Sequence, residues 1–368
     1  MAQLPESIVD PVASAIFAHY KAKHDAEPAR GYLGASSIGK SCSRALWYGF
    51  RWAKPAEFTG RLYRLFQSGH LQEPRVVADL RAIGCQVYEV NPADGKQFSF
   101  SEPSTGHHFR GNCDGILTGL PGAEKTVHML EVKTSSDKLF KVLQKDGVEK
   151  AKPEHFAQMQ IYMKWSIDQF GDDGCRRALY VCVNKNTDDI HTERLEYRPA
   201  AAQALIDKAL AIVKAVEPPI GISTDSTYYE CKFCDYHALC HGTAVPAPTC
   251  RSCAWVTPLT KEKDAGWACN NHIGFLVDEP KQRLGCAKHL FIPVLLVRTA
   301  STVDASDTSV TYRTDLGNQF TNGDPAQHPE HLSSAEIHAM QDKAILGSVA
   351  NDAFLMEMRT KFGGRLVA

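Results

Sequence analysis

The chain has 368 residues, of which 43% are hydrophobic, and a formal net charge of −1, values typical of a soluble folded protein. The near-neutral charge gives no overall attraction to nucleic acid. No run of about 18 apolar residues exists, which excludes a membrane-spanning helix, and residues 1–10 lack the apolar core of a secretion signal. We therefore expect a cytoplasmic protein, in the bacterial host cytoplasm if it is phage-encoded.

An amphipathic helix is predicted at residues 4–23, where apolar residues recur one turn apart. Residues 28–66 follow, rich in basic and aromatic side chains and with a single acid, Glu57. This mixture suits the backbone and unstacked bases of a single-stranded nucleic acid, but it also suits two amphipathic helices with solvated faces. The basic residues are Arg30, Lys40, Arg44, Arg51, Lys54, Arg61 and Arg64, and the aromatic residues are Tyr32, Trp47, Tyr48, Phe50, Trp52, Phe58 and Tyr63.

Two helices are predicted over this part of the chain, the first at residues 38–51 and the second at about residues 61–83. The first contains Cys42. On the second, His70 and Glu73 are three residues apart and share a face. The pair is either a surface ion pair or a source of a further metal ligand beside a sheet.

The centre of the chain reads as successive antiparallel strands. They are predicted at residues 86–90, 97–101, 106–117 and 127–134. The third carries Asp114, and the fourth carries Glu131 and Lys133. Because side chains alternate along a strand, Glu131 and Lys133 share a face opposite to Leu130 and Val132, and we expect them at an exposed sheet face.

This residue set has a chemical logic, although a Glu–Lys pair alone is also common on edge strands. Two carboxylates, Asp114 and Glu131, bind a hard cation such as Mg²⁺ through oxygen. The cation lowers the pKa of a bound water and polarises a phosphoryl oxygen. The ammonium group of Lys133 holds the attacking water or neutralises charge that develops on the phosphate.

Helices are predicted at residues 138–149 and 153–170. On the second, Gln158 and Tyr162 are four residues apart and lie on one face. Beside a metal site they could position phosphate or water, but the same spacing occurs in ordinary half-buried helices. Strands at 177–183 and 190–197 and a helix at 200–216 follow. The order of elements predicts an α/β fold, with a mixed central sheet flanked by helices.

Twelve cysteines are many for a chain without a secretion signal, and they favour metal sites over disulfides. Cys231, Cys234 and Cys240 form one closely spaced group. A tetrahedral site needs a fourth thiolate, and Cys42 is the natural candidate.

A second cysteine group follows a Pro- and Ala-containing linker at residues 243–248. Two Cys-x2-His pairs follow a Cys-x2-Cys pair, a pattern that resembles a small zinc module. The expected ligands are Cys250, Cys253, Cys269 and Cys286, with His272 or His289 as substitutes. A segment with so few apolar residues needs metal to fold.

The remaining residues, 291–368, show no chemistry. A strand is predicted at 292–297, a hairpin at 310–320 with its turn at 315–317, and a helix that begins near Ser333.

The hairpin with Asp114 and Glu131-Val-Lys133 resembles the PD-(D/E)XK nuclease superfamily, with Cys113 in place of the proline. The cysteine arrangement, with Ser-Ser-x4-Cys-Ser-Arg, Gly-His-x2-Glu and Gln-x3-Tyr in the same order, resembles its RecB-like iron–sulfur branch. That branch includes CRISPR-associated RecB-like exonucleases and the AddB nuclease domain, and similar proteins occur in phages beside the lambda-type recombination exonucleases. The likeness covers about residues 30–242.

The resemblance implies a role for each matching residue. His70, Asp114, Glu131 and the Val132 carbonyl would bind Mg²⁺ or Mn²⁺. Lys133 would be catalytic with Asp114 and Glu131, assisted by Gln158 and Tyr162. A [4Fe–4S] cluster on Cys42, Cys231, Cys234 and Cys240 would staple the ends of the nuclease domain, and zinc there would do the same.

We therefore expect a RecB-like nuclease domain at residues 1–245, a zinc-binding module at 246–295 and an α/β extension at 296–368. The predicted function is metal-dependent exonuclease action on single- or double-stranded DNA ends, in phage or prokaryotic recombination, replication or repair. No P-loop motif is present, so a separate helicase would unwind DNA. A single-strand annealing or binding protein is a further candidate partner, and an oligomer is possible.

Three alternatives remain open at this point. One is an end-trimming nuclease for CRISPR adaptation, in the same fold. The second is a catalytically inactive DNA-binding scaffold, and the third, which rests only on residues 250–289, is a zinc-dependent regulator.

Overall fold

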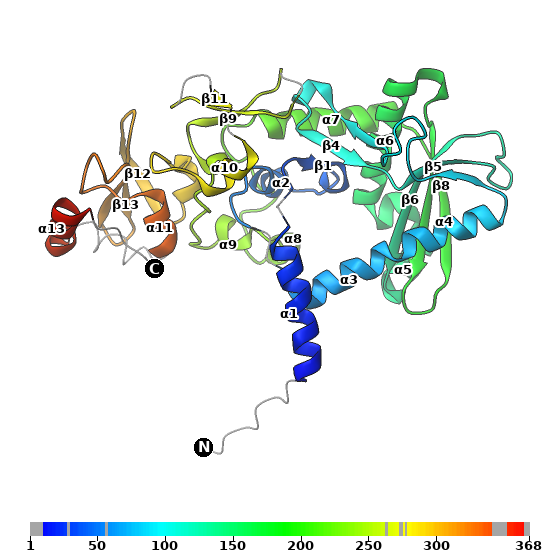
Figure 1. Cartoon of the computed structure of the whole chain (residues 1–368), viewed down its shortest axis with the longest axis horizontal. Coiled ribbons are helices and arrows are strands. Elements are labelled where there is room, and N and C mark those ends of the chain that lie inside the picture. Colours follow the sequence, from blue (N-terminus) through cyan, green and yellow to red (C-terminus); the bar gives the residue numbers. More distant parts are fainter. Residues whose placement is uncertain are drawn as a thin grey trace, which may run out of the picture. The chain divides into compact units, whose positions relative to one another are not determined.

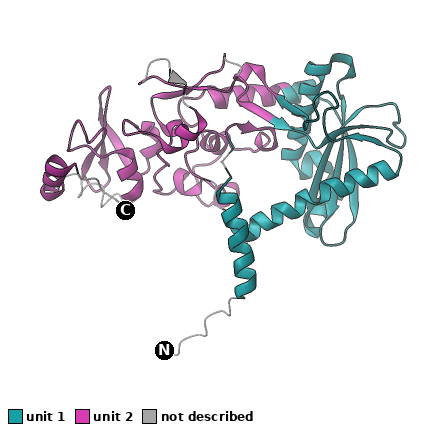
Figure 2. Cartoon of the chain, in the orientation of Figure 1, with its two compact units in different colours: residues 1–30, 56–100, 111–202 teal, residues 31–55, 101–110, 203–368 magenta. Residues whose placement is uncertain are grey.

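A computed structural model describes residues 10–27, 30–55, 58–261, 264–271, 275–276, 278–340 and 352–363 (Figure 1). The chain forms two compact units, which are coloured separately in Figure 2. Unit 1 comprises residues 1–30, 56–100 and 111–202, and unit 2 comprises residues 31–55, 101–110 and 203–368. In the described part of the chain, no helix is both long enough and apolar enough to cross a membrane.

A five-stranded mixed sheet forms the centre of unit 1, with strand order β2-β5-β6-β7-β8. The strands are β2 (Gln86–Tyr88), β5 (Gly115–Thr118), β6 (His128–Ser135), β7 (Arg177–Asn184) and β8 (Ile190–Glu196). β6 and β7 are parallel, and the other neighbours are antiparallel. The connection between the parallel pair contains helices α5 (Asp137–Ala151) and α6 (Pro153–Phe170). The predicted α/β fold with a mixed sheet is confirmed.

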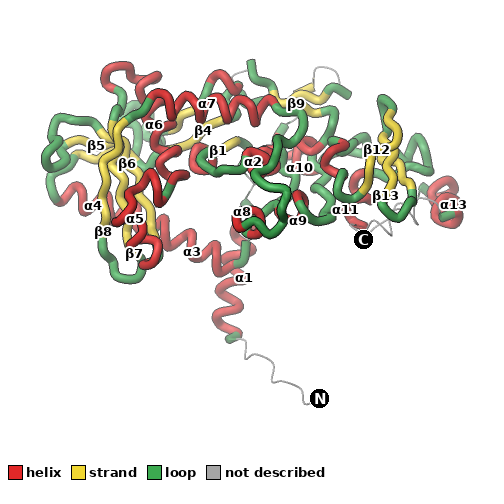
Figure 3. Tube along the Cα trace, turned by 180° about the vertical axis from the view of Figure 1, so that it is seen from behind, coloured by secondary structure: helices red, strands yellow, loops and turns green. Residues whose placement is uncertain are grey.

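Both faces of this sheet are covered, as expected when a helical crossover joins parallel strands. One face carries Leu130 and Val132, which join a hydrophobic core with Val76 and Leu80 of helix α4 (Gln72–Ala82). The other face is contacted by α6, which Figure 3 shows from behind. The predicted exposed sheet face is therefore wrong, because α6 packs on the side that carries Glu131.

The single helix predicted at residues 61–83 is two helices, α3 (Gly60–His70) and α4. Pro74 has no N–H, so it cannot donate the helical hydrogen bond to the carbonyl of His70. Helix α1 (Pro11–Asp25) packs on α3, and a Cβ at Gly60 would lie 1.8 Å from the carbonyl oxygen of Phe17. Residues 4–9 of the predicted first helix lie outside the described residues.

The predicted run of four antiparallel strands is also wrong in part. Only β2, β5 and β6 of that run pair in the main sheet. β3 (Ser99–Ser101) stands outside it, and the long strand predicted at 106–117 is divided into β4 (Phe109–Asn112) and β5. The division falls at Asp114. Its side chain accepts a hydrogen bond from the backbone N–H of Val132 on β6, in the place of a carbonyl of a paired strand.

Unit 2 begins with β1 (Leu33–Gly34), which pairs in parallel with the first two residues of β4, and with α2 (Ser43–Phe50). Trp47, Tyr48, Phe50 and Trp52 are all buried here. Arg51 is buried with them and donates hydrogen bonds to the carbonyls of Val256 and Ala215, at 2.8 and 3.2 Å. These five residues form core, so they are not available as a platform for a nucleic-acid strand.

Short elements make up the middle of unit 2. A three-stranded antiparallel sheet has the order β11-β10-β9. The elements are α7 (Pro199–Lys214, which begins in unit 1), α8 (Tyr229–Lys232), α9 (His237–Cys240), β9 (Val256–Pro258), β10 (Trp267–Cys269), β11 (Phe275–Leu276) and α10 (Glu279–Leu284).

The C-terminal part has its own small core beneath an antiparallel sheet. Its strands are β12 (Ala300–Ala305), β13 (Val310–Thr314) and β14 (Gln319–Asn322), followed by α11 (Ser334–Met340) and α13 (Ala353–Phe362). The predicted hairpin is confirmed, and its turn uses Gly317 at φ 86°. The strand predicted at 292–297 is instead a short 3-10 helix, Pro293–Leu296, in which the proline provides no N–H for a strand ladder.

Helix α11 begins as predicted. The carboxylate of Glu336 accepts the backbone N–H of Ser333 at 2.8 Å, and the Ser333 hydroxyl accepts the N–H of Glu336 at 3.3 Å. This reciprocal capping box satisfies two backbone donors at the helix start.

Candidate active site

Asp114, Glu131 and Lys133 come together in unit 1 where β5 and β6 meet. Asp114 directly precedes β5, and its Oδ2 accepts a hydrogen bond of 2.7 Å from the backbone N–H of Val132. The alternation of β6 places Glu131 and Lys133 on one face, as predicted, and Nζ of Lys133 donates to Oε1 of Glu131. The sequence spacing therefore predicted the grouping correctly.

Glu131 is completely buried. None of the described residues donates a hydrogen bond to its second oxygen, Oε2. Burial raises the pKa of Glu131 to about 8; the nearby Lys133 acts against this increase, while the charge of Asp114 adds to it. A buried carboxylate with a free oxygen is costly unless a further group binds it.

The neighbouring charges respond in the same way. Burial raises the pKa of Asp114, although Lys133 and the Val132 N–H both favour its charged form. Burial alone would lower the pKa of Lys133, but the carboxylates of Glu131 and Asp114 outweigh it and the net change is upward. Lys133 is therefore a protonated donor at neutral pH and not a base.

Helix α4 adds a third carboxylate to this group, that of Glu73. Burial raises the pKa of Glu73, and the charge of Asp114 raises it further, which places the two carboxyl groups within electrostatic reach. His70 lies 3.4 Å from Glu73, Nδ1 to Oε1, and its side chain is 75% exposed. The sequence paired these residues but named only His70 as a ligand; the shared helix face was the signal for Glu73.

Gln158 and Tyr162 face the same site from α6. The Tyr162 hydroxyl donates to the carbonyl of Asn112 at 2.7 Å, and Gln158 Nε2 donates to that hydroxyl at 3.2 Å. Burial raises the pKa of Tyr162, and the Glu131 carboxylate adds to the shift. Since Asn112 is two residues before Asp114, these side chains fix the end of β4 from which Asp114 projects.

His155, one turn before Gln158, was not predicted from the sequence. Its Nδ1 lies 2.9 Å from the Tyr180 hydroxyl, and Tyr180 is opposite Glu131 in the pairing of β6 and β7. Burial, together with the charge of Lys133, lowers the pKa of His155 to about 3. The imidazole is therefore neutral. The sequence signal that could have identified His155 is its position on the same helix as Gln158, one turn earlier.

The donor set fits a hard divalent cation. Asp114, Glu131 and Glu73 offer carboxylate oxygens, which Mg²⁺ and Mn²⁺ prefer. Oε2 of Glu131 is buried with no donor among the residues that the structure describes, as a cation ligand would be. Val132 contributes its N–H to Asp114, and the proposed role of its carbonyl stays a prediction.

The first cysteine set lies within unit 2. Cys42 immediately precedes α2 instead of lying inside a helix, and Cys231 and Cys240 belong to α8 and α9. Burial raises the pKa of Cys231, and the thiols of Cys240 and Cys42 raise it further. Burial also raises the pKa of Cys234, to which Cys42 contributes. The fold thus brings residue 42 to thiols almost two hundred positions later, as the predicted cluster requires.

The second cysteine set also gathers. Burial raises the pKa of Cys250 to about 11, and Cys286 and Cys269 add to the shift. The pKa of Cys253 is raised to about 12, mainly by burial, with contributions from Cys286 and Cys250. Each of the four thiols is therefore within electrostatic reach of at least one other, and the metal they would hold stays a prediction.

The two substitute ligands have different outcomes. His289 is buried, and its Nε2 lies 2.8 Å from the carbonyl oxygen of Thr249, which accepts a hydrogen bond from it. Burial lowers the pKa of His289 to about 4. His272 lies outside the described residues.

No protein-family model and no curated protein sequence matches the chain. Among solved structures, it is similar to the protein SSO0001 at 15% identity and a TM-score of 0.37, over 63% of this chain and 98% of that one. It is also similar to LHK-Exo in complex with dAMP, at 17% identity and a TM-score of 0.35, over 54% and 90%. A second structure of LHK-Exo, an alkaline exonuclease from Laribacter hongkongensis, is similar at 18% identity and a TM-score of 0.32, over 53% of this chain and 90% of that one. At these values the function has to be argued from the site itself.

Proposed function

We propose that the chain is a Mg²⁺- or Mn²⁺-dependent deoxyribonuclease of the PD-(D/E)XK type that degrades linear DNA as an exonuclease. One observation carries the proposal: the buried carboxylate of Glu131 lies on the same strand face as its partner Lys133, and its Oε2 accepts no hydrogen bond from any described residue. Burying the Glu131 carboxylate costs desolvation free energy. A hard cation bound at Oε2 would offset that cost.

Asp114, Glu131 and Glu73 would hold the cation, with His70 and the Val132 carbonyl as further ligands. When bound, the cation supplies Lewis-acid polarisation of a phosphoryl oxygen and lowers the pKa of water. The chain contributes the positions of these oxygens, which the Asp114–Val132 hydrogen bond and the strand pairing fix before substrate arrives.

Lys133 supplies the positive charge. Its ammonium group is protonated because the surrounding carboxylates favour the charged form, so it donates to the attacking water or to the phosphate oxygen where negative charge develops. Gln158 and Tyr162 act through Asn112 and hold Asp114 in place. They are positioning residues in this scheme.

The proposal extends to the cysteines and to the setting. A [4Fe–4S] cluster on Cys42, Cys231, Cys234 and Cys240 closes a loop of almost two hundred residues, which restricts the unfolded chain most when the loop is long. Zinc on the second cysteine set orders a segment with few apolar residues. The substrate is DNA in phage or prokaryotic recombination, replication or repair, with unwinding left to a separate helicase.

The test compares linear DNA labelled at either end, single- and double-stranded, with a closed circle. Wild type, Lys133→Ala and the control Lys141→Ala are assayed with Mg²⁺, Mn²⁺ and EDTA; Lys141 is an exposed lysine paired with Asp137 on α5. We expect metal-dependent release of label from linear DNA by wild type and Lys141→Ala, with no release by Lys133→Ala although DNA binding changes only a few-fold. Cutting of the circle would show an endonuclease, and binding without cleavage in any metal would overturn the proposal.

A further inference from the structure

Three potential metal ligands gather in the turn between β14 and α11, far along the chain from the candidate active site. Nδ1 of His328 lies 3.3 Å from Oε1 of Glu330, and Nε2 of His331 lies 3.9 Å from the same oxygen. The two imidazole rings are stacked, with centroids 4.6 Å apart. One ligand atom from each of the three residues can be chosen such that all lie within 4.8 Å of one another.

Hydrogen bonds hold the backbone of this turn on both sides of Glu330. The carbonyl of Asp324 accepts the N–H of His328 at 3.0 Å, and the carbonyl of His328 accepts the N–H of His331 at 2.9 Å. Arg359 of α13 donates to the carbonyls of Pro329 and His331, at 3.1 and 2.6 Å, on either side of Glu330. The ligands are therefore spaced by a fixed backbone before any ion arrives, which is what a preorganised site needs.

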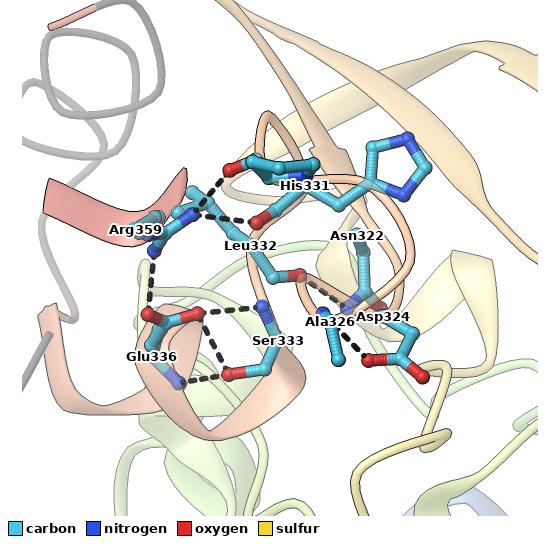
Figure 4. Close-up of polar contacts among 9 residues, drawn as sticks. Asn322, Asp324, Ala326, His331, Leu332, Ser333, Glu336 and Arg359 are labelled. Atoms are coloured by element: carbon cyan, nitrogen blue, oxygen red, sulfur yellow. Dashed lines mark hydrogen bonds and ion pairs between the residues drawn. The ribbon is translucent and has the colours of Figure 1, made fainter. Parts of the chain in front are cut away.

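Figure 4 shows how Arg359 is itself held. Its guanidinium pairs with the carboxylate of Glu336, and both side chains are more than nine-tenths buried. Glu336 in turn accepts the N–H and hydroxyl of Ser333. Arg359 is thus anchored by a buried ion pair and not by an exposed surface contact.

The ring of His331 packs against Gly323, and a side chain at residue 323 would clash with it. A Cβ at Gly323 would lie 2.4 Å from Nδ1 of His331. That nitrogen is buried and finds no hydrogen-bond partner among the residues described by the structure, while Nε2 points to Glu330. The glycine therefore admits the ring in an orientation that leaves Nε2 directed at the cluster.

Two imidazole nitrogens and one carboxylate oxygen are the ligands of a borderline divalent ion such as Zn²⁺, Co²⁺ or Ni²⁺. Without a bound ion, the contacts among these three side chains would add little to the stability of the fold, because exposed ion pairs contribute little. The side chains of His328 and Glu330 are 54% and 58% exposed, which gives an ion direct access.

We propose that His328, Glu330 and His331 form a binding site for a divalent first-row transition ion of the zinc type, distinct from the oxygen-rich site of Asp114 and Glu131. Three protein ligands leave at least one coordination position open to solvent or to a small anionic ligand. The proposal does not rest on the nuclease function.

The test is titration of the full-length protein with Co²⁺, because nitrogen and oxygen ligation differs spectroscopically from ligation by the thiols. The variants are His328→Ala, Glu330→Gln and His331→Ala, and the control is His24→Ala. His24 also pairs with a carboxylate, at 3.2 Å from Glu27, but has no second imidazole in that pair. Zn²⁺ competition then gives the affinity at the same site.

We expect wild type and His24→Ala to bind one more equivalent of Co²⁺ than His328→Ala, with a spectrum free of thiolate-to-cobalt bands for that equivalent. Loss of one ligand should weaken Zn²⁺ binding at least about tenfold. Glu330→Gln keeps the size of an exposed side chain, so it tests the site even if His331→Ala disturbs packing. Unchanged stoichiometry and affinity in both His328→Ala and Glu330→Gln, or an equal loss in His24→Ala, would overturn the proposal.

Discussion

Lys133 donates a hydrogen bond from its ammonium group to Oε1 of Glu131, two positions earlier on the same strand. The lysine side chain keeps 29% of its surface exposed while the glutamate has none. The pair therefore links a buried carboxylate to solvent through one ammonium group. This arrangement makes the charge of Glu131 dependent on pH and on whatever binds Oε2.

Glu131→Gln is predicted to remove a pH-dependent loss of stability. Burial raises the pKa of Glu131 from 4.5 to about 8 in the folded chain, so the folded state binds more protons than the unfolded state between these values. The free energy of unfolding therefore falls as the pH rises through that window. In EDTA, wild type should lose about 1–4 kcal/mol relative to Glu131→Gln between about pH 5 and pH 8, measured by urea unfolding.

Metal addition provides the control for this prediction. A bound Mg²⁺ would favour the charged carboxylate, so at about pH 8 adding it should restore stability to wild type and have little effect on Glu131→Gln. Parallel stability curves for the two proteins in EDTA would mean that Glu131 titrates normally and that the site is misassigned.

The sequence predicted the chemical set but not its burial. Alternation along one strand was enough to group Glu131 with Lys133, and the helix predicted at residues 153–170 has the same bounds as α6. The packing of α6 on the sheet face that carries Glu131 is a tertiary contact. The sequence of the strand does not indicate which helix of the crossover packs there. A carboxylate in a strand reads as exposed until that packing is known.

Other features were beyond the sequence for similar reasons. The buried aromatic residues of α2 look like a nucleic-acid surface in sequence, since periodicity cannot distinguish an internal cation–aromatic cluster from an external one. Arg51 shows this, because its guanidinium lies 5.1 Å from the ring centroid of Trp267, more than two hundred residues later. The cluster at His328 depends in the same way on Arg359, which no local pattern connects to it.

Glu73→Gln should raise the Mg²⁺ concentration needed for half-maximal cleavage. The variant keeps the size of the side chain but removes a carboxylate on which the charge of Asp114 acts, and we expect about a tenfold shift, with the maximal rate less affected. The matched control is Glu89→Gln, because Glu89 is an exposed glutamate paired with Arg81 in the same unit. Identical metal dependence in wild type and Glu73→Gln would remove Glu73 from the site.

Tyr162→Phe should lower activity by misplacing Asp114. The change removes the hydroxyl that donates to Asn112 at 2.7 Å and leaves that carbonyl without this donor, at a cost of about 1–3 kcal/mol. We expect a lower kcat with a nearly unchanged KM for DNA, since the hydroxyl acts on the chain and not on the substrate. A loss of activity that appears only as a higher KM, with kcat unchanged, would instead place Tyr162 in direct contact with DNA.

Cys234→Ser is predicted to lower thermal stability together with iron and acid-labile sulfide content in anaerobically purified protein, because it removes one of the four proposed cluster ligands. Cys85→Ser is the control, since Cys85 is a buried cysteine of the unit 1 core whose thiol contacts the carbonyl of Gly119. Cys85→Ser should keep the metal content of wild type. Colourless wild-type protein with zinc at Cys42, Cys231, Cys234 and Cys240 would identify the staple as zinc and contradict the iron–sulfur assignment.

Arg359→Met should destabilise the C-terminal part of unit 2 far more than loss of a surface ion pair. The Arg359 side chain is buried, and its removal takes away the guanidinium that pairs with the buried carboxylate of Glu336, which costs about 3–5 kcal/mol. Lys361→Met is the control on the same helix, where an exposed pair with Glu357 contributes at most about 1 kcal/mol. The double variant Arg359→Met, Glu336→Gln should recover part of the loss, because no buried charge then remains. Denaturant unfolding that gives equal values for Arg359→Met and Lys361→Met would show that the buried pair does not hold the turn at His331.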